Sequence, residues 1–278
     1  ALEIAQSSND QHALYSASID PYSERRLALM GELRTAIEKD LLKLAYQPQV
    51  DVLNETVCGV EALLRWQHEE MGFIPPDEFI PLAEQTGVIR ALTRWVLEKA
   101  LTQCAYFLEK GIELKMSINL SARNLHEDGL AEFFMDLVNR LKIPVHLVVL
   151  EVTESAMMED QERALEVLTD LDEKGFKISI DDFGTGYSSL AYLKKLPVKE
   201  IKIDRSFVME MSTQKDDLMI VHTTIEMAHN LGLEVVAEGV EDQESLDTLR
   251  DMGCDVAQGY FLSRPVPVSD LEAWLETS

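Results

Sequence analysis

The sequence predicts an α/β fold, namely a TIM-like (β/α)8 barrel with an antiparallel first strand. From residue 43 onward, short apolar runs rich in β-branched residues alternate with amphipathic segments long enough for helices. There are eight such runs, and 278 residues are enough for a barrel, which takes about 250 residues as one domain. Residues 53–56 join the first two runs and are too few for a crossover helix, which predicts a hairpin there. A doubly wound sheet is the alternative.

The N-terminal part differs in character from the rest. Residues 1–22 are expected to be the tail of an upstream domain, because they begin with Ala rather than Met and are largely polar without periodicity. A linker helix is expected over 23–42, since Asp20 can cap it and Pro21 suits its first turn. The barrel is expected over 43–278.

The elements of the barrel follow from the two periodicities. Strands are expected at 44–52, 57–65, 115–120, 147–152, 177–182, 200–204, 234–238 and 256–261. Helices are expected near 77–108, 124–141, 157–174, 187–195, 215–231, 242–252 and 268–276.

The composition limits the possible partners. A formal charge of −25 at pH 7 repels phosphate backbones, so we expect no binding to DNA or RNA polymers. A small phosphate ligand remains compatible with this charge if bound divalent cations reverse it locally. Three scattered cysteines and no signal peptide or membrane span indicate a cytoplasmic chain without membrane contact, although the parent protein could be anchored.

The ends of the expected strands carry the chemistry. Acidic residues end four of them or follow them directly, and a fifth acid lies within the second strand: Glu61, Glu151, Asp181 with Asp182, Asp204 and Glu238. Asn119 and Gln258 occupy corresponding positions on two further strands. In a β/α barrel the C-terminal ends of the parallel strands meet at one mouth, so these side chains are expected to converge. Carboxylates gathered in one cleft must protonate or bind cations.

Oxygen ligands without clustered His or Cys favour Mg²⁺ or Mn²⁺ over zinc. Lys202 shares a strand face with Asp204 and is expected to point into the mouth. Lys202 either neutralises the neighbouring acids or acts directly in catalysis, and the two roles are compatible.

Eight short motifs, in this order, resemble the EAL-domain cyclic di-GMP phosphodiesterases from Tyr46 to Pro265. They are Glu61-Ala62-Leu63-Leu64-Arg65-Trp66, Phe79-Ile80-Pro81-Leu82-Ala83-Glu84, Ser117-Ile118-Asn119-Leu120-Ser121, Glu151-Val152-Thr153-Glu154, Asp181-Asp182-Phe183-Gly184-Thr185-Gly186, Lys202-Ile203-Asp204-Arg205-Ser206-Phe207, Glu238-Gly239-Val240-Glu241 and Gln258-Gly259-Tyr260. The resemblance implies a metal-dependent hydrolase that converts cyclic di-GMP to linear pGpG in bacterial second-messenger turnover.

The same resemblance implies a role for each matching residue. Two ions, Mg²⁺ or Mn²⁺, would be held by Glu61, Asn119, Glu151, Asp181 and Asp182. Glu238 would be the general base or a water-mediated partner of the metal, and Lys202 would hold the attacking water or neutralise charge. Glu61 would also act in catalysis. Substrate contacts would come from Gln47, Leu63, Arg65, Asp204 and Gln258. Glu154 would anchor the loop Asp182–Ser189, which links metal binding to the contact of a homodimer.

Residues 1–22 resemble more weakly the end of a GGDEF domain, which implies an upstream GGDEF or sensor module in the full-length protein. Two alternatives to the enzyme remain. One is a non-catalytic receptor for cyclic di-GMP, which typically lacks some of these acids. The other is an unrelated metal-dependent barrel of the enolase type, which also places acids and a lysine at strand ends.

Overall fold

The computed structural model describes residues 24–186 and 190–276. Their contacts divide them into two compact units, a larger one of residues 44–64 and 93–276 and a smaller one of 24–43 and 65–92. The tail expected at residues 1–22 lies outside the described residues.

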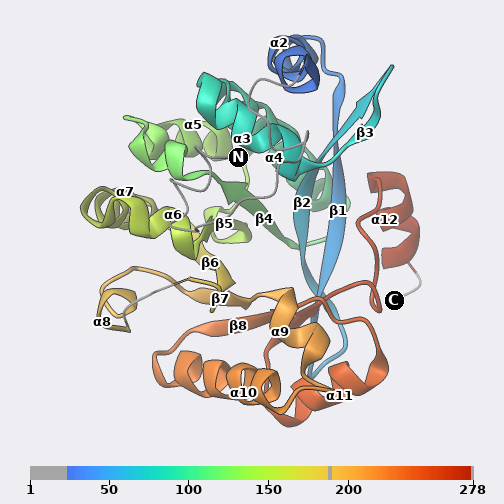
Figure 1. Ribbon diagram of the computed structural model, residues 1–278, viewed down its shortest axis with the longest axis vertical. Helices are drawn as coiled ribbons and strands as arrows, with labels where there is room; N and C mark the ends of the chain where they lie inside the picture. The colour runs from blue at the N-terminus through green and yellow to red at the C-terminus, as the bar shows by residue number, and fades with distance from the viewer. Residues whose placement is uncertain (1–23, 187–189, 277–278) are drawn as a thin grey trace. The chain divides into compact units, whose positions relative to one another are not determined.

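The larger unit is built around a closed ring of eight strands (Figure 1). Around the ring the order is β1, β9, β8, β7, β6, β5, β4 and β2, and pairing of β1 with β2 closes it. The strands are β1 (Leu42–Asp51), β2 (Val57–His68), β4 (Lys115–Leu120), β5 (Val148–Thr153), β6 (Lys177–Phe183), β7 (Glu200–Ile203), β8 (Glu234–Glu238) and β9 (Val256–Gln258). The predicted barrel is therefore confirmed.

The first strand runs against the others, as predicted. Val50 on β1 lies opposite Ala257 in an antiparallel ladder, whereas β2 and β4 to β9 pair in parallel. A tight turn after β1 makes the reversal possible. The Oδ1 atom of Asp51 accepts hydrogen bonds from the backbone N–H groups of Leu53 and Asn54, at 3.0 and 2.7 Å.

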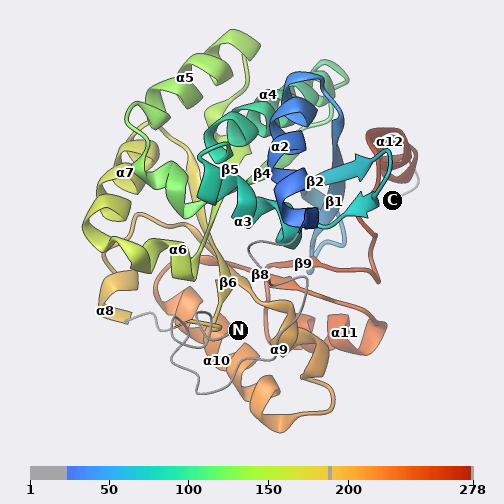
Figure 2. The same ribbon diagram turned by 45° about the horizontal axis from the view of Figure 1, so that its top comes forward.

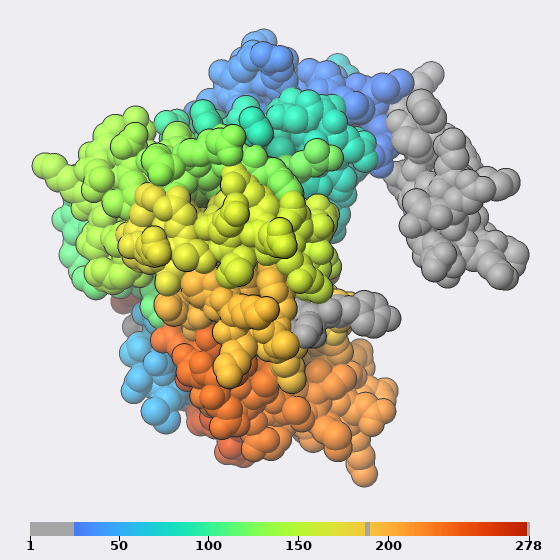
Figure 3. Space-filling view, turned by 90° about the vertical axis from the view of Figure 1, so that its left-hand side faces the viewer, coloured from blue at the N-terminus to red at the C-terminus, as the bar shows by residue number. Residues whose placement is uncertain are grey.

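The helices of the larger unit lie outside the ring of strands (Figures 1 and 2). They are η1 (Ala122–His126), α5 (Leu130–Leu141), η2 (Val145–Leu147), α6 (Glu154–Glu159), α7 (Gln161–Glu173), α8 (Leu190–Leu193), α9 (Arg205–Glu210), α10 (Lys215–Asn230), α11 (Gln243–Asp251) and α12 (Val268–Leu275), with most of α4 (Ile89–Glu109). Helix α7 shows why they pack there. Asp160 caps its first turn, and its apolar stripe of Ala164, Val167, Leu168 and Leu171 is buried. Figure 3 shows the outer face formed by α7, α8 and α10.

Several predicted boundaries are wrong for local reasons. The single helix expected over 77–108 is two helices, α3 (Pro76–Thr86) and α4, because Gly87 ends the first with φ 75°. The strand expected over 256–261 stops at Gln258, and Gly259 then passes so close to Val240 that a Cβ atom there would meet its backbone. Helix α9 was not predicted, and Asp204 starts it by accepting a hydrogen bond from the Ser206 N–H.

The smaller unit contains α2 (Glu24–Glu38), α3 and β3 (Gly72–Ile74), a short strand that the sequence did not predict. Strand β3 pairs antiparallel with the end of β2, where Trp66 lies opposite Ile74. The Trp66 ring meets Phe79 of α3 edge-on, with 5.4 Å between the ring centroids, and an ion pair joins Arg25 of α2 to Glu78 of α3.

Among the described residues, no helix is long and apolar enough to cross a bilayer.

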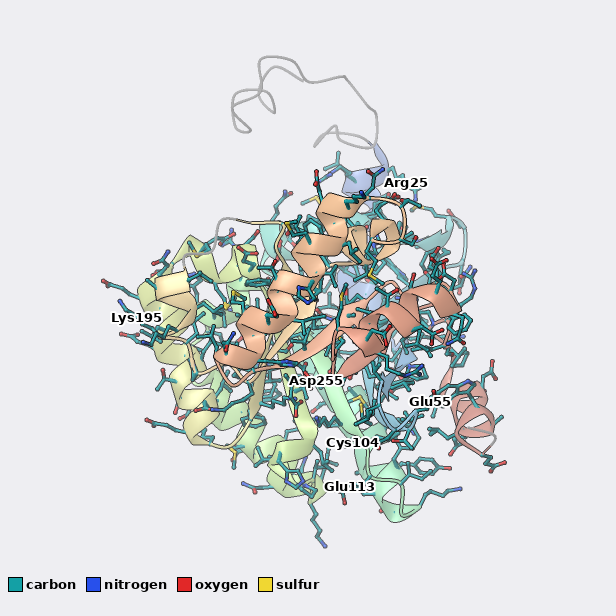
Figure 4. All side chains as sticks on the ribbon, turned by 90° about the horizontal axis from the view of Figure 1, so that it is seen from below. Arg25, Glu55, Cys104, Glu113, Lys195 and Asp255 are labelled. Atoms are coloured by element: carbon teal, nitrogen blue, oxygen red, sulfur yellow. The ribbon has the colours of Figure 1, made fainter. Side chains whose placement is uncertain are left out.

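The base of the barrel, defined as the N-terminal end of its parallel strands, carries a cluster of four charged residues. Lys115, Lys177, Glu200 and Glu234 are the first residues of β4, β6, β7 and β8. The Lys177 Nζ lies 2.7 Å from Glu200 Oε2 and also pairs with Glu234, which lies 3.2 Å from the Lys115 Nζ. The labelled Glu55, Glu113 and Asp255 lie in connections at this same end (Figure 4).

We expect Glu234→Gln to destabilise the protein modestly and only above acidic pH. Burial alone would raise the Glu234 pKa, but the hydrogen bonds and charges of Lys177 and Lys115 lower it. A carboxyl group with a lowered folded pKa stabilises above its unfolded pKa, and this contribution disappears as the pH falls through the folded value. Because the side chain is 49% exposed, the loss should be about 0.5–1 kcal/mol.

Urea unfolding at neutral and at strongly acidic pH would measure this difference. The control is Glu113→Gln, which removes a carboxylate at the same end whose contact to His146 is 4.0 Å long. Equal losses for the two variants, or a loss from Glu234→Gln that persists in acid, would contradict the role of the cluster.

Candidate active site

Seven polar side chains come from seven parallel strands, one from each strand, and all except Glu61, which lies within β2, are within two residues of the C-terminal end of their strand. They are Glu61 of β2, Asn119 of β4, Glu151 of β5, Asp181 of β6, Lys202 of β7, Glu238 of β8 and Gln258 of β9. The strand register places two neighbouring pairs directly opposite each other: Asn119 lies opposite Glu151, and Glu238 lies opposite Gln258. Residues far apart in the sequence thus meet at the mouth of the barrel, defined as the C-terminal end of these strands.

Lys202 lies at the centre of this group. Its Nζ atom is 2.7 Å from Glu238 Oε1, 3.0 Å from Glu151 Oε2, 3.3 Å from Asp181 Oδ1 and 3.5 Å from Glu61 Oε2. The side chain is 1% exposed, so these contacts form away from bulk water. A single ammonium group therefore contacts four carboxylates and can offset part of their charge. A direct catalytic role for Lys202 stays a prediction.

Glu61 is held by two amide groups. Asn119 Nδ2 donates to Glu61 Oε1 at 2.7 Å, and Gln258 Nε2 donates to Glu61 Oε2 at 2.6 Å. The same Gln258 nitrogen lies 3.2 Å from Gln47 Oε1, and Gln49 Nε2 donates to Gln258 Oε1 at 3.0 Å. Sequence reasoning missed Gln49, although it lies two residues after Gln47 and therefore on the same face of β1.

Burial and crowding shift the proton equilibria of the acids. Burial, reinforced by the charge of Glu61, raises the pKa of Glu151 well above its usual value. Burial also raises the pKa of Glu238 to about 8, although Lys202 opposes that shift. With this pKa, Glu238 is mostly protonated at neutral pH, and a bound cation nearby would shift it toward the ionised form that can accept a proton.

The pKa of Glu61 moves the other way. Burial would raise it, but the charge of Lys202 and the hydrogen bonds from Gln258 and Asn119 hold it below its usual value. Burial would lower the pKa of Lys202, but the surrounding carboxylates, first Asp181, raise it well above the usual value. At neutral pH the mouth therefore contains an ionised Glu61 beside a charged Lys202.

A second pair of acids, Asp182 and Asp204, lies next to this group. The pairing of β6 with β7 is irregular between Ile180 and Phe183, and Asp182 adopts φ 54°. Burial and the charges of Asp181 and Asp204 raise the pKa of Asp182 to about 6. Because the backbone is irregular here, the side chains of two successive acids, Asp181 and Asp182, both lie near the mouth.

Glu154 contacts the loop after β6. Its Oε2 atom accepts hydrogen bonds from the N–H groups of Gly184 at 3.0 Å and Gly186 at 3.3 Å. A Cβ atom at position 186 would lie 2.9 Å from the Glu154 carboxyl group, so glycine is needed for this approach. The end of the predicted loop, at Ser189, lies outside the described residues.

The remaining predicted contacts lie on β2. Leu63 follows Glu61 by two residues and therefore faces the same side of the strand. Arg65 belongs to the smaller unit, and its expected contact with a phosphate stays a prediction.

The donor atoms at the mouth suit a hard divalent cation. They are carboxylate and amide oxygens, and Glu151 Oε1 is buried without a hydrogen-bond partner among the described residues. In the part of the chain that the structure describes, no three His, Cys, Asp or Glu side chains surround a common metal position. The ammonium group of Lys202 stands between the carboxylates instead, so these residues fit a metal by chemistry but must turn to bind one.

Comparisons with known proteins agree on one family. Residues 30–265 match the family model described as EAL domain. The chain is 42% identical over 264 residues to the bifunctional diguanylate cyclase/cyclic di-GMP phosphodiesterase MucR of Pseudomonas aeruginosa. It is 37% identical over 264 residues to the cyclic di-GMP phosphodiesterase PA2567 of the same organism.

These matches cover 94% and 95% of this chain but 38% and 45% of the two relatives, so the chain spans less than half of their length. Among solved structures, the PaMucR phosphodiesterase in complex with c-di-GMP matches with a TM-score of 0.84 at 43% identity. That match covers 88% of this chain and 99% of the other.

Proposed function

The chain belongs to the EAL domain family, and on that premise we propose that it is a metal-dependent phosphodiesterase that hydrolyses cyclic di-GMP to linear pGpG. One observation carries the proposal beyond family membership. Four carboxylates from four strands meet within 3.5 Å of one buried ammonium group, beside two amide side chains. The family resemblance assigns metal and catalytic roles to these same residues.

The proposed reaction breaks one phosphorus–oxygen bond. Because pGpG keeps a 5′-phosphate, water oxygen bonds to phosphorus while the bond to the 3′-oxygen breaks, and that oxygen leaves with a proton. Glu238, whose Oε1 atom lies 2.7 Å from the Lys202 Nζ, accepts the proton of the attacking water once the cations have favoured its ionised form. Lys202 donates hydrogen bonds to the water or to the phosphate oxygens, and Gln258 keeps Glu61 oriented.

Two divalent cations, when bound, would lower the pKa of the water and neutralise the developing charge. We assign them to Glu61, Asn119, Glu151, Asp181 and Asp182, whose oxygens are of the type that Mg²⁺ and Mn²⁺ prefer. Their charge would also let a chain with a net charge of −25 accept a dianionic ligand.

A product assay separates the enzyme from its alternatives. Incubation with cyclic di-GMP and Mg²⁺ or Mn²⁺ should give pGpG, and a chelator should stop its formation. Tight binding without product would favour the non-catalytic receptor. The complete set of acids argues against the receptor, and the ordered motifs argue against an unrelated barrel of the enolase type.

Magnesium affinity is expected to fall as the pH decreases from 8 to 6. The pKa of Glu238 is raised to about 8 and that of Asp182 to about 6. Between pH 6 and pH 8, the metal-free protein therefore carries protons on these two carboxyl groups. A bound metal must displace the proton of its ligand Asp182, and its positive charge would lower the pKa of the nearby Glu238. Calorimetric titration in two buffers of different ionisation enthalpy would measure the proton release at each pH.

The comparison for this titration is Asp182→Asn, which leaves the ligands Glu61, Asn119, Glu151 and Asp181. Magnesium bound by these ligands should still release a proton near pH 8, and the release that centres near pH 6 should be lost. Magnesium binding without any proton release between pH 6 and 8 would contradict the assignment of both groups.

We place the reaction in the cytoplasm, and we propose an upstream GGDEF or sensor module and a homodimer. The first relatives are more than twice as long as this chain, which supports further domains. Leu190, Met209 and Met219 of α8, α9 and α10 are exposed apolar side chains available for a dimer contact. Sedimentation of the chain with and without Leu190→Glu would test the dimer.

A further inference from the structure

Two exposed aromatic side chains follow the last barrel strand. Tyr260 and Phe261 are 49% and 41% exposed, and Tyr260 comes two residues after Gln258, whose amide group contacts Glu61. They belong to residues 259–265, the rim segment, which is the first part of the connection from β9 to α12. Large apolar rings exposed beside a ligand site suggest that a ligand covers them.

The rim segment is fixed to the mouth at both of its sides. The Phe261 N–H donates to the Val240 carbonyl at 3.0 Å, just after β8, and a Cβ atom on Gly259 would lie 2.1 Å from that same carbonyl oxygen. On the other side, Gln47 Nε2 of β1 donates to the Ser263 carbonyl at 3.1 Å. Tyr260 is thus held beside the mouth by backbone contacts rather than by its own side chain.

Arg264 stacks on this aromatic ring. Its guanidinium carbon lies 4.3 Å from the centroid of Tyr260. The chain has 50 acidic and 25 basic residues, yet among the described residues no carboxylate forms an ion pair with Arg264. An exposed arginine that is free of carboxylates keeps its charge available for an anionic ligand.

We propose that Tyr260 and Arg264 form a stacking platform for one purine base of the cyclic dinucleotide. The inference rests on the proposed function and adds a base-binding position to it. A purine ring stacks on an aromatic side chain and on a guanidinium plane alike, and such stacking tolerates different bases. The platform therefore selects for a purine dinucleotide over a simple phosphodiester, and it contributes to binding rather than to the chemical step.

The test compares Tyr260→Leu with a matched aromatic residue at the other end of the larger unit. Tyr106 lies near the end of α4, the helix that leads to the N-terminal end of β4. It is 38% exposed, and the Lys110 Nζ lies 5.2 Å from the centroid of its ring. Tyr106→Leu therefore removes a similar pair of an aromatic ring and a cation, away from the mouth. For cyclic di-GMP, Tyr260→Leu should raise KM by about tenfold or more, as expected for one lost stack, while kcat changes less than about twofold.

Two further readouts distinguish the platform from a structural role. Tyr260→Phe should keep the KM of the unchanged protein, since the ring remains, and Arg264→Gln should raise it. Turnover of methyl p-nitrophenyl phosphate, which has no base, should be unaffected by Tyr260→Leu. An unchanged KM in Tyr260→Leu, an equal rise in Tyr106→Leu, or a parallel loss on the base-free substrate would overturn the proposal.

The same variants separate this inference from the proposed function. Calorimetric titration with cyclic di-GMP measures affinity whether or not pGpG forms. If the unchanged protein makes no pGpG but Tyr260→Leu binds cyclic di-GMP at least about tenfold more weakly, the platform stands and the hydrolase does not. If pGpG forms normally and the affinity does not depend on Tyr260, the hydrolase stands and the platform does not.

Discussion

Replacing Glu61 by glutamine is expected to abolish the formation of pGpG, by at least about 10³-fold, or about 4 kcal/mol at 1.36 kcal/mol per tenfold. The change keeps the size of the side chain and removes its negative charge. Glu61 lies 3.5 Å from the Lys202 Nζ and accepts hydrogen bonds from Asn119 and Gln258. A neutral amide is a far weaker metal ligand than a carboxylate, and one of its two ends would present N–H groups to a donor.

The measurement is the rate of pGpG formation with saturating Mg²⁺ or Mn²⁺, together with calorimetric metal titration. The control is Glu127→Gln, which removes another buried carboxylate, one paired with Arg94 and outside the group around Lys202. It should keep its turnover. A rate for Glu61→Gln close to that of the control would refute the assigned ligand.

The second large effect is expected from Lys202→Met in the absence of metal. The variant leaves four carboxylates facing one another without their shared cation. Removing one partner of a buried ion pair typically costs about 3–5 kcal/mol of unfolding free energy. Added Mg²⁺ or Mn²⁺ should restore much of this stability, because a bound cation replaces the missing charge. Turnover should stay low, since Lys202 is also assigned to the water.

Urea unfolding in a chelator and in excess metal gives the two stabilities of each variant. Lys177→Met is the matched control, because Lys177 is also largely buried and paired with two glutamates, but at the base of the barrel. Metal should stabilise that control only as much as the unchanged protein. If Lys202→Met gains no more from metal than Lys177→Met does, Lys202 does not act as an internal counter-ion.

Periodicity was sufficient to predict much of the barrel. Apolar runs in the sequence indicate the parallel strands, and the residue after each run lies at the mouth of the barrel. Glu151, Asp181 and Glu238 could therefore be placed at the mouth from spacing alone. The roles of Gln47, Arg65 and Glu154 came from the family resemblance instead. Nothing in the spacing of single residues distinguishes a ligand contact from an ordinary polar side chain.

Other features depend on contacts that no local pattern records. Strand β9 ends at Gln258, where Gly259 begins a close approach to the backbone of Val240, whereas the sequence prediction carried the strand on through Tyr260 and Phe261. The same error hid the exposure of the two rings. Lys202 was expected to point into the mouth, but its contact with four carboxylates at once required the closure of the whole ring.

The reversed direction of β1 determines where the chain enters the barrel. A parallel first strand would begin at the base, whereas β1 begins at the mouth and reaches Gln47 five residues after Leu42. Anything that pulls on the polypeptide before Leu42 therefore acts on the catalytic end of the strand first. This path from the segment before the barrel to the mouth is short, and it needs no relay through the barrel core.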